Sequence, residues 1–88
     1  MRFFIVAIRD MVAEAYSVPQ FVVNIGATVR GFGDEIRRPK PDGNPAALQD
    51  HPEDFNMYSL GEYDDSNGVF ELHAPKLIAQ GRDYKEQK

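Results

Sequence analysis

The stretch HPEDFNMYSLGEYDDSNGVF, residues 51–70, carries most of the information about the fold of this chain. Pro52 suits the first position of a short helical turn. The segment 56–63 then has the length and composition of a β-strand. Asn67-Gly68 favours positive φ angles in a tight turn, so the strand 69–73 should return beside the first as a β-hairpin.

Side chains in the two hairpin strands should alternate between the faces of the sheet. One face should carry Tyr58 and Leu60 and the other Met57 and Tyr63, while Phe70 and Leu72 should point the same way. Pro75 should end the second strand. We expect 76–79 to add an edge strand and 81–88 to form a polar tail.

The N-terminal third of the chain predicts further strands. Residues 1–9 read as a strand whose apolar residues are consecutive, which indicates a central place in the sheet. Residues 13–15 have the composition of a helical turn, and Pro19 should precede a short strand at 20–23. The proline- and glycine-rich segment 40–49 should be a loop.

One amphipathic helix is expected between Asn24, its N-cap, and Arg38, because Pro39 stops it. Its apolar residues recur at helical spacing, on the face formed by Ile25, Val29, Phe32 and Ile36. Three glycines in the same segment are poor helix formers, and we expect them to let the helix lie close to the sheet.

This order of elements predicts an α+β fold: a small antiparallel or mixed sheet, made of the N-terminal strand and the C-terminal hairpin, covered by one amphipathic helix. The chain has 88 residues, so we expect a single domain over residues 1–80. Such a small domain is marginally stable, and without cysteine it gains nothing from disulfides. We therefore expect oligomerisation, in the simplest case a homodimer.

The net charge of −4 is unevenly distributed. Residues 1–40 hold six basic and four acidic groups, residues 41–75 hold eight acidic and no basic groups, and residues 76–88 hold four basic and two acidic groups. We call residues 41–75 the acidic block. It is either a solvated surface that keeps the protein soluble or a docking site for a basic partner.

The sequence gives little support for catalysis or metal binding. Asp64-Asp65-Ser66-Asn67-Gly68 lacks EF-hand spacing, since position twelve of such a loop would be Ala74. His51 with Glu53 and Asp54 is better explained by helix capping than by a metal site. We therefore expect no enzyme activity, cofactor or metal. The longest apolar run, 3–8, is far shorter than the roughly 18 residues of a membrane span, so we also expect no membrane association.

Single-stranded nucleic acid is the partner that the aromatic residues suggest. The chain has ten aromatic residues, many for its length, and Tyr16, Tyr58 and Tyr63 are candidates for surface stacking platforms. Phosphates would meet basic groups in or just after the helix, namely Arg30, Arg37, Arg38 and Lys40. A sequence pI near 5.0 is the opposite of the usual footprint of a nucleic-acid-binding protein.

Three motifs together resemble the small nonstructural protein of gokushoviruses, which are bacteriophages of the Microviridae with single-stranded DNA. They are AEAY at 13–16 with VRGF at 29–32, the HPEDF turn at 51–55, and the GEYDDSNG hairpin at 61–68. The similarity covers most of residues 1–73. The segments 40–49 and 75–88 differ most from the family pattern.

The resemblance implies a viral protein outside the capsid that acts in genome replication in the cytoplasm of the bacterial host. DNA binding is the implied activity, and no catalytic residues transfer. We expect non-specific binding of single-stranded DNA by an oligomer, with Tyr16 and Tyr58 as stacking residues. The alternative function is an acidic interaction module, in which the acidic block docks on the viral replication initiator or a host replication protein.

Overall fold

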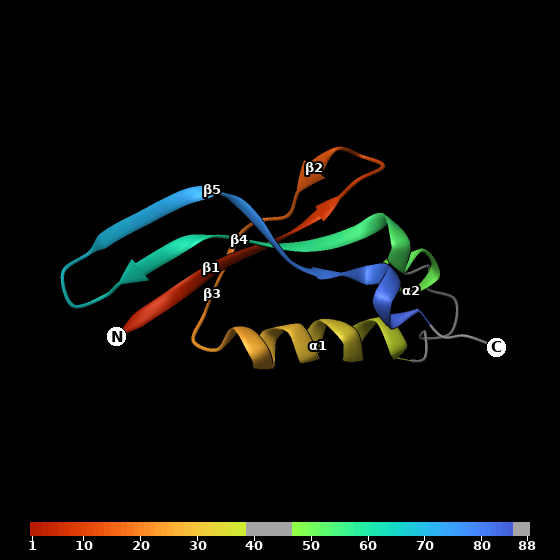
Figure 1. Ribbon diagram of the computed structural model, residues 1–88, viewed down its shortest axis with the longest axis horizontal. Coiled ribbons are helices and arrows are strands. Elements are labelled where there is room, and N and C mark those ends of the chain that lie inside the picture. The colour runs from red at the N-terminus through yellow and green to blue at the C-terminus, as the bar shows by residue number, and fades with distance from the viewer. Residues whose placement is uncertain (39–46, 86–88) are drawn as a thin grey trace.

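The fold is α+β, as predicted: an antiparallel sheet with one main helix packed against one of its faces (Figure 1). The structure is a computed structural model that describes residues 1–38 and 47–85. Its strands are β1 (Arg2–Asp10), β2 (Ala15–Tyr16), β3 (Gln20–Val22), β4 (Phe55–Asp64) and β5 (Val69–Gln80), and its helices are α1 (Ile25–Arg37), α2 (Ala47–Asp50) and the 3-10 helices η1 (Pro52–Asp54) and η2 (Gly81–Tyr84).

The N-terminal strand is central, as its continuous apolar run predicted. β1 pairs with β4 along its whole length, and its other edge is shared by β2 and β3. β4 pairs in turn with β5, which gives the order β2-β1-β4-β5, and every pairing is antiparallel. Of the two predicted kinds of sheet, antiparallel or mixed, the described strands therefore form the antiparallel one.

The segment after β1 is a turn and a strand, not the expected helical turn. The carboxylate of Asp10 accepts hydrogen bonds from the backbone N–H groups of Val12 and Ala13, at 3.0 and 3.1 Å. These bonds close a turn over residues 11–14, and Ala15–Tyr16 then returns along β1 as β2. The local hydrogen bonds of Asp10 compete successfully with helix formation here.

Helix α1 begins at the predicted cap and ends one residue earlier than expected. The side chain of Asn24 accepts a hydrogen bond from the N–H of Ala27, at 2.9 Å. The predicted apolar face packs on the sheet: Phe32 and Ile36 are buried with Val6 and Met57, and the remaining two positions of that face lie against this cluster. This cluster is the core that joins helix and sheet.

The glycines of α1 do not have the role expected of them. A Cβ on Gly33 would lie 2.6 Å from Cδ1 of Tyr84, so the element close to this glycine is η2 and not the sheet. A Cβ on Gly31 would meet nothing within 4 Å. Gly33 thus lets η2 approach the helix, with the rings of Phe32 and Tyr84 edge to face at 5.9 Å. The segment 81–88, expected as a polar tail, is therefore packed through Gly81 and Tyr84, and residues 86–88 lie outside the described range.

The region before the hairpin is more regular than predicted. Residues 47–50, expected in a loop, form α2, and the rest of that predicted loop up to residue 46 lies outside the described residues. Pro52 starts the 3-10 helix η1, as predicted, but its N-cap residue His51 makes no side-chain capping bond. Buried Pro52 and the close approach of Gly81 to its carbonyl oxygen hold η1 against η2.

A β-bulge in β4 overturns the predicted alternation. Ile5 pairs with Gly61 and Val6 with Ser59, so Leu60 is the extra residue. The bulge puts Leu60 and Gly61 on one side, and Tyr63 therefore shares the face of Tyr58, not that of Met57. Gly61 adopts φ 151°, a conformation that side chains disfavour.

The predicted end of the hairpin is also wrong. β5 runs from Val69 through Pro75 to Gln80 as one strand. Its pairing with β4 jumps from Gly61–Leu72 to Ser59–Lys76, so residues 73–75 form an irregularity beside Leu60. Because β5 is an edge strand with such a bulge, it accommodates a proline that lacks an N–H. The turn itself is as expected at Gly68, with φ 72°, but Asn67 keeps a negative φ.

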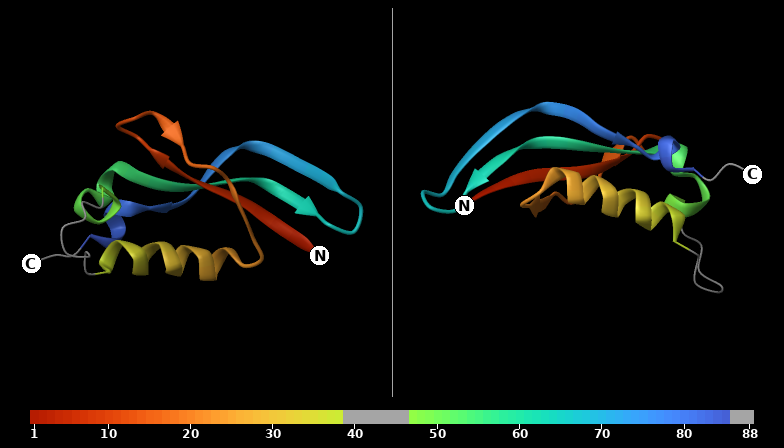
Figure 2. Two further views of the ribbon diagram at one scale, coloured as in Figure 1. Left: turned by 180° about the vertical axis from the view of Figure 1, so that it is seen from behind. Right: turned by 60° about the horizontal axis from the view of Figure 1, so that its bottom comes forward.

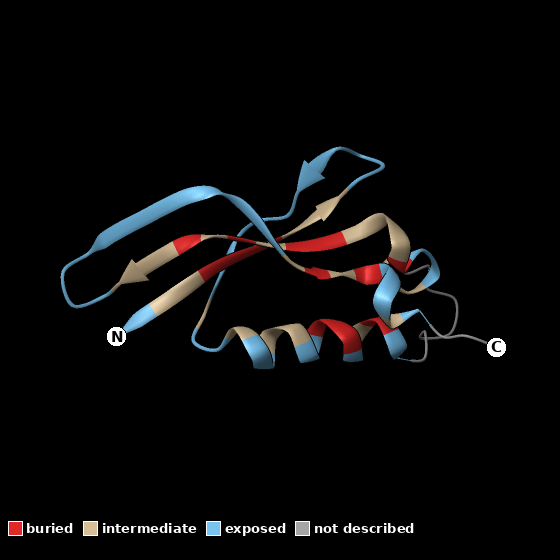
Figure 3. Cartoon of the chain, in the orientation of Figure 1, coloured by how far each residue is buried: buried red, intermediate tan, exposed pale blue. Residues whose placement is uncertain are grey.

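The sheet extends well beyond the helix. Figure 2 shows α1 under one part of the curved sheet and the β4–β5 hairpin projecting past it. Figure 3 shows the consequence: the buried residues lie where sheet and helix overlap, and most of β5 is exposed. None of the helices in the described residues is long and apolar enough to cross a membrane.

Candidate functional site

The face of the sheet turned away from α1, here called the open face, carries a cluster of aromatic rings. Strand register places Phe3 beside Tyr63 and Tyr63 beside Phe70, while Phe21 comes from β3. Ring centroids of Tyr63 and Phe70 are 4.6 Å apart, and Phe21 lies 5.7 Å from Tyr63 and 6.2 Å from Phe70. These are contact distances for aromatic pairs.

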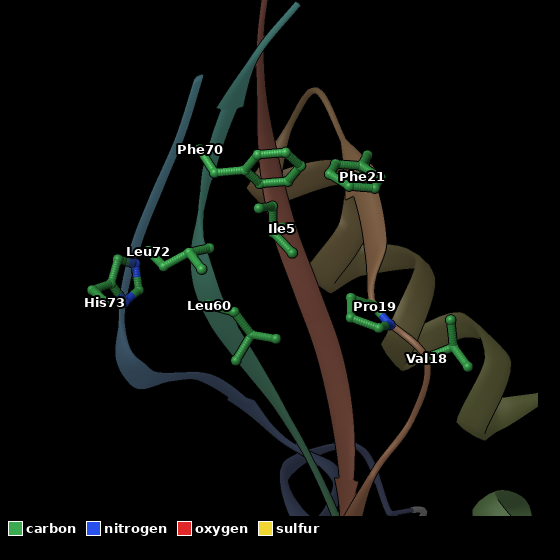
Figure 4. A pocket seen from close by; sticks show the side chains of 8 residues that line it. All are labelled: Ile5, Val18, Pro19, Phe21, Leu60, Phe70, Leu72 and His73. Carbon is green, nitrogen blue, oxygen red and sulfur yellow. The ribbon is translucent and has the colours of Figure 1, made fainter. Parts of the chain in front are cut away.

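An apolar groove, here called the aromatic groove, crosses the open face next to these rings (Figure 4). It has a volume of about 530 Å³. The side chains of Ile5 and Leu60 lie in its middle, and the rings of Phe21 and Phe70 lie next to each other at one end of it, with centroids 6.2 Å apart. Its remaining lining residues are Val18, Pro19, Leu72 and His73.

The groove is exposed and mostly apolar. Phe21 is 52% exposed, Phe70 53%, Leu72 70% and Val18 85%. Among the described residues, none that lines it is acidic, lysine or arginine. The ring nitrogen Nδ1 of His73 lies 2.7 Å from the backbone oxygen of Ala74. The groove therefore offers apolar contact and ring stacking, and no charge for an anion.

A second aromatic group lies on the open face at the other end of β1. The register places Tyr16 opposite Arg9 and Tyr58 opposite Ala7. The tyrosine rings meet edge to face at 5.7 Å, and the guanidinium of Arg9 lies 5.2 Å from the centroid of Tyr16. This is a cation–π contact, with Tyr16 39% exposed. Two residues predicted for stacking, Tyr16 and Tyr58, are thus brought together, and Arg9 joins them.

The predicted phosphate-binding residues lie elsewhere. Arg30 lies in the middle of α1, Arg37 ends the helix and Arg38 follows it. All three are exposed, in the layer that packs on the face of the sheet opposite the open face (Figure 1). The Arg38 guanidinium pairs with Glu35 at 2.7 Å, and that of Arg37 lies 5.3 Å from the ring of Tyr84. Arg30 makes no ion pair within the described residues. Lys40 lies outside the described range.

The acidic block carries its charges in local contacts where it is described. Arg2 joins Glu62 at 3.1 Å and Glu71 at 3.3 Å, and these carboxylates hold the pKa of the guanidinium above its usual value. The Met1 amino group lies 2.7 Å from Asp65, whose hydrogen bond raises the pKa of that amine. These contacts reduce the charge available to a docking partner.

Asp64 closes the hairpin turn. Its carboxylate accepts hydrogen bonds from the hydroxyl and the backbone N–H of Ser66, at 2.6 and 2.9 Å. The hydroxyl bond, and then the backbone bond, lower the pKa of Asp64. Its neighbourhood is that of a turn carboxylate, as predicted, with no EF-hand geometry around it.

The cluster of His51, Glu53 and Asp54 has ligand atoms within 4.8 Å of one another. Glu53 accepts a hydrogen bond from the ammonium of Lys85 at 3.1 Å, and this bond is the main cause of its lowered pKa. Nδ1 of His51 lies 3.8 Å from the same carboxylate. The ion pair of Lys85 with Glu53 links η1 to the residue that follows η2.

Sequence reasoning missed Arg9 and the aromatic groove. Arg9 ends the N-terminal strand, but its position opposite Tyr16 follows only when residues 11–14 are recognised as a turn. Phe70 and Leu72 were correctly placed on one face. The alternation did not reveal that this face has no helix, and Phe21 reaches it from a separate strand.

Comparison with known proteins assigns the chain. Searches of curated proteins and of solved structures gave no match. A family model described as phage ORF5 protein matches residues 3–84. This range contains the whole sheet except the first residue of β1, and also contains helix α1. The chain therefore belongs to the phage ORF5 protein family.

Proposed function

We propose that this bacteriophage protein is a non-enzymatic accessory of genome replication that binds single-stranded DNA, in the cytoplasm of the bacterial host. Family membership supports a phage origin. The HPEDF and GEYDDSNG motifs favour a gokushovirus of the Microviridae within that range. In this proposal the protein needs no cofactor and acts alongside the viral replication initiator.

The observation that carries the proposal is the contact of Arg9, Tyr16 and Tyr58 on the open face. Single-strand binders present aromatic rings to bases and cations to the backbone, and each stacked base contributes about 1–3 kcal/mol. Here the guanidinium of Arg9 lies over the partly exposed ring of Tyr16, next to the ring of Tyr58. The site reads no base edges, so binding would be independent of sequence.

In this arrangement the expected phosphate contacts move from the arginines in and after α1 to Arg9. Arg9 becomes the main candidate, because it lies on the open face with Tyr16 and Tyr58, whereas Arg37 and Arg38 lie in the helix layer, where Arg38 is paired with Glu35. Arg30 lies in the helix layer, so a DNA strand bound on the open face would reach it only by passing round the edge of the sheet. The local ion pairs of the acidic block make the alternative, docking on a basic protein, the weaker hypothesis.

The test is fluorescence anisotropy with a labelled single-stranded oligonucleotide at low salt. We expect binding that weakens as salt rises, since phosphate contacts release counterions. Tyr16→Leu and Arg9→Gln should each weaken binding about 10-fold, as expected for one lost stacking or charge contact. The control is Arg82→Gln, an exposed arginine on η2 that bonds only to Gln80 within the described residues.

Three results would reject the proposal: no binding at tens of micromolar protein, binding indifferent to salt, or equal loss in Arg82→Gln and Arg9→Gln. A loss confined to a triple Arg30→Gln, Arg37→Gln, Arg38→Gln variant would transfer the site to the helix layer.

A further inference from the structure

The aromatic groove shares the open face with the contact of Arg9, Tyr16 and Tyr58, but it lies at the other end of β1 and has no residue in common with that contact. It is apolar and exposed, and no helix covers it. A monomeric protein seldom exposes several large apolar side chains side by side unless the patch is an interaction site. We propose that a second copy of this chain docks on the aromatic groove, so that two grooves meet about a two-fold axis and the contact of Arg9, Tyr16 and Tyr58 stays outside the interface.

The chemistry of the lining favours another apolar surface over an anion or a charged peptide. The lining has no Lys, Arg, Asp or Glu among the described residues. A nucleic-acid strand or an acidic segment would have to bring its charge to a site without a counter-charge, which is costly. An identical face brings only rings and aliphatic groups, and needs no charge complementarity.

The exposed area is in the range that a small dimer needs. A phenylalanine buries about 150–250 Å² when fully covered, so the half-exposed Phe21 and Phe70 leave on the order of 200 Å². With the more exposed Leu72 and Val18, the patch is on the order of 500 Å² per copy. Two such patches together remove on the order of 1,000 Å², the lower limit for a specific interface.

The position of the patch suits two-fold self-association. Its residues come from the centre and both sides of the sheet: Ile5 from β1, Phe21 from β3 and Phe70 from the edge strand β5. In a two-fold dimer each of these side chains meets the partner's copy of the same face. The contact would supply the stability that a domain of this size cannot draw from one small core.

The test is sedimentation equilibrium of the full chain without DNA, which separates this inference from the DNA-binding proposal. Phe70→Lys places a charge in the interface twice per dimer, and we expect it to weaken dimerisation on the order of 100-fold. Val69→Lys is the matched control: Val69 is the next residue of β5, is similarly exposed at 47%, and points to the opposite face.

A second interface variant, Phe21→Lys, changes a different strand and should have the same effect as Phe70→Lys. Circular dichroism of each variant establishes that it is folded. A wild-type protein that stays monomeric at millimolar concentration would overturn the inference. So would a dimer that both phenylalanine variants leave intact, or one that Val69→Lys weakens equally.

Discussion

The two faces of one sheet both carry large apolar side chains, yet only one face is covered. Phe32 of α1 is 4% exposed in the core, whereas Phe70 on the open face is 53% exposed. Lengths explain the difference: the 13 residues of α1 span about 20 Å, while the 12 residues of β5 span up to about 40 Å. One helix therefore covers only part of one face, and the remaining apolar surface is left for partners.

The comparison predicts unequal costs for removing the two phenylalanine rings. Phe32→Ala leaves a cavity in the core and should lower the free energy of unfolding by about 3–5 kcal/mol. A domain of this kind has about 5–15 kcal/mol in total, so the variant should be close to unfolding. Urea unfolding at low micromolar concentration, where the proposed dimer contributes least, measures the loss.

Phe70→Ala is the control for that experiment. Its ring is half exposed on the open face, beside the rings of Phe21 and Tyr63, so we expect a loss of about 1 kcal/mol or less in the monomer. Comparable losses in the two variants would show that the open face is as tightly packed as the core, and the distinction between the faces would fail.

A second pair of variants examines the bulge that shapes the groove. Gly61→Ala forces a side chain into a positive-φ conformation, where its Cβ would lie 2.9 Å from Cα of Leu72 and closer still to the carbonyl oxygen of Glu71. We expect a loss of about 1–3 kcal/mol in the free energy of unfolding. Thermal unfolding followed by circular dichroism measures it.

Gly31→Ala is the opposite case. A Cβ there meets nothing within 4 Å, and the residue lies inside α1. Alanine should therefore raise stability, by at most about 1 kcal/mol. If Gly61→Ala were neutral, the bulge would not depend on glycine, and the placement of Leu60 and Tyr63 on the open face would need another cause.

Local signals in the sequence predicted the local structure well. The cap at Asn24, the helical spacing up to Ile36 and the turn at Gly68 are each decided by residues close together in the chain, and each is observed. The bulge at Leu60 was signalled by the glycine after it, because glycine within a strand often marks a bulge. Strict alternation along residues 56–63 predicts Tyr63 on the face of Met57, whereas the bulge puts it on the face of Tyr58.

The candidate site was only partly predictable, because it depends on contacts between distant segments. Tyr16 and Tyr58 meet through two strand pairings, β1 with β2 and β1 with β4. Their residue types suggested stacking, but only the register shows that they touch each other and that Arg9 joins Tyr16. The arginines of α1 were chosen for their number and charge, and the layer in which they lie could not be read from the sequence.

The smallest expected effect concerns pH and the uncovered hairpin tip. The bonds from Ser66 lower the pKa of Asp64, so the folded state is favoured above the carboxyl's ordinary pKa of 3.8, and this contribution is lost as pH falls through the lowered value. Because the group is exposed, the loss should be small and confined to acid pH. Asp64→Asn keeps an oxygen acceptor but cannot titrate, so its stability should change less between pH 6 and pH 2.5 than that of the wild type.

Glu53→Gln is the counterpart at the helix end, where the bond from Lys85 lowers the carboxyl pKa. Amide chemical shifts measured as pH falls distinguish the hairpin tip from the helix end of the sheet. Asp64→Asn should remove the acid-induced change in the amide shift of Ser66 and leave that of Lys85 unchanged. Loss of both shifts in one variant would mean that the hairpin tip and the helix-covered part of the sheet titrate as one unit, and would break the distinction between them.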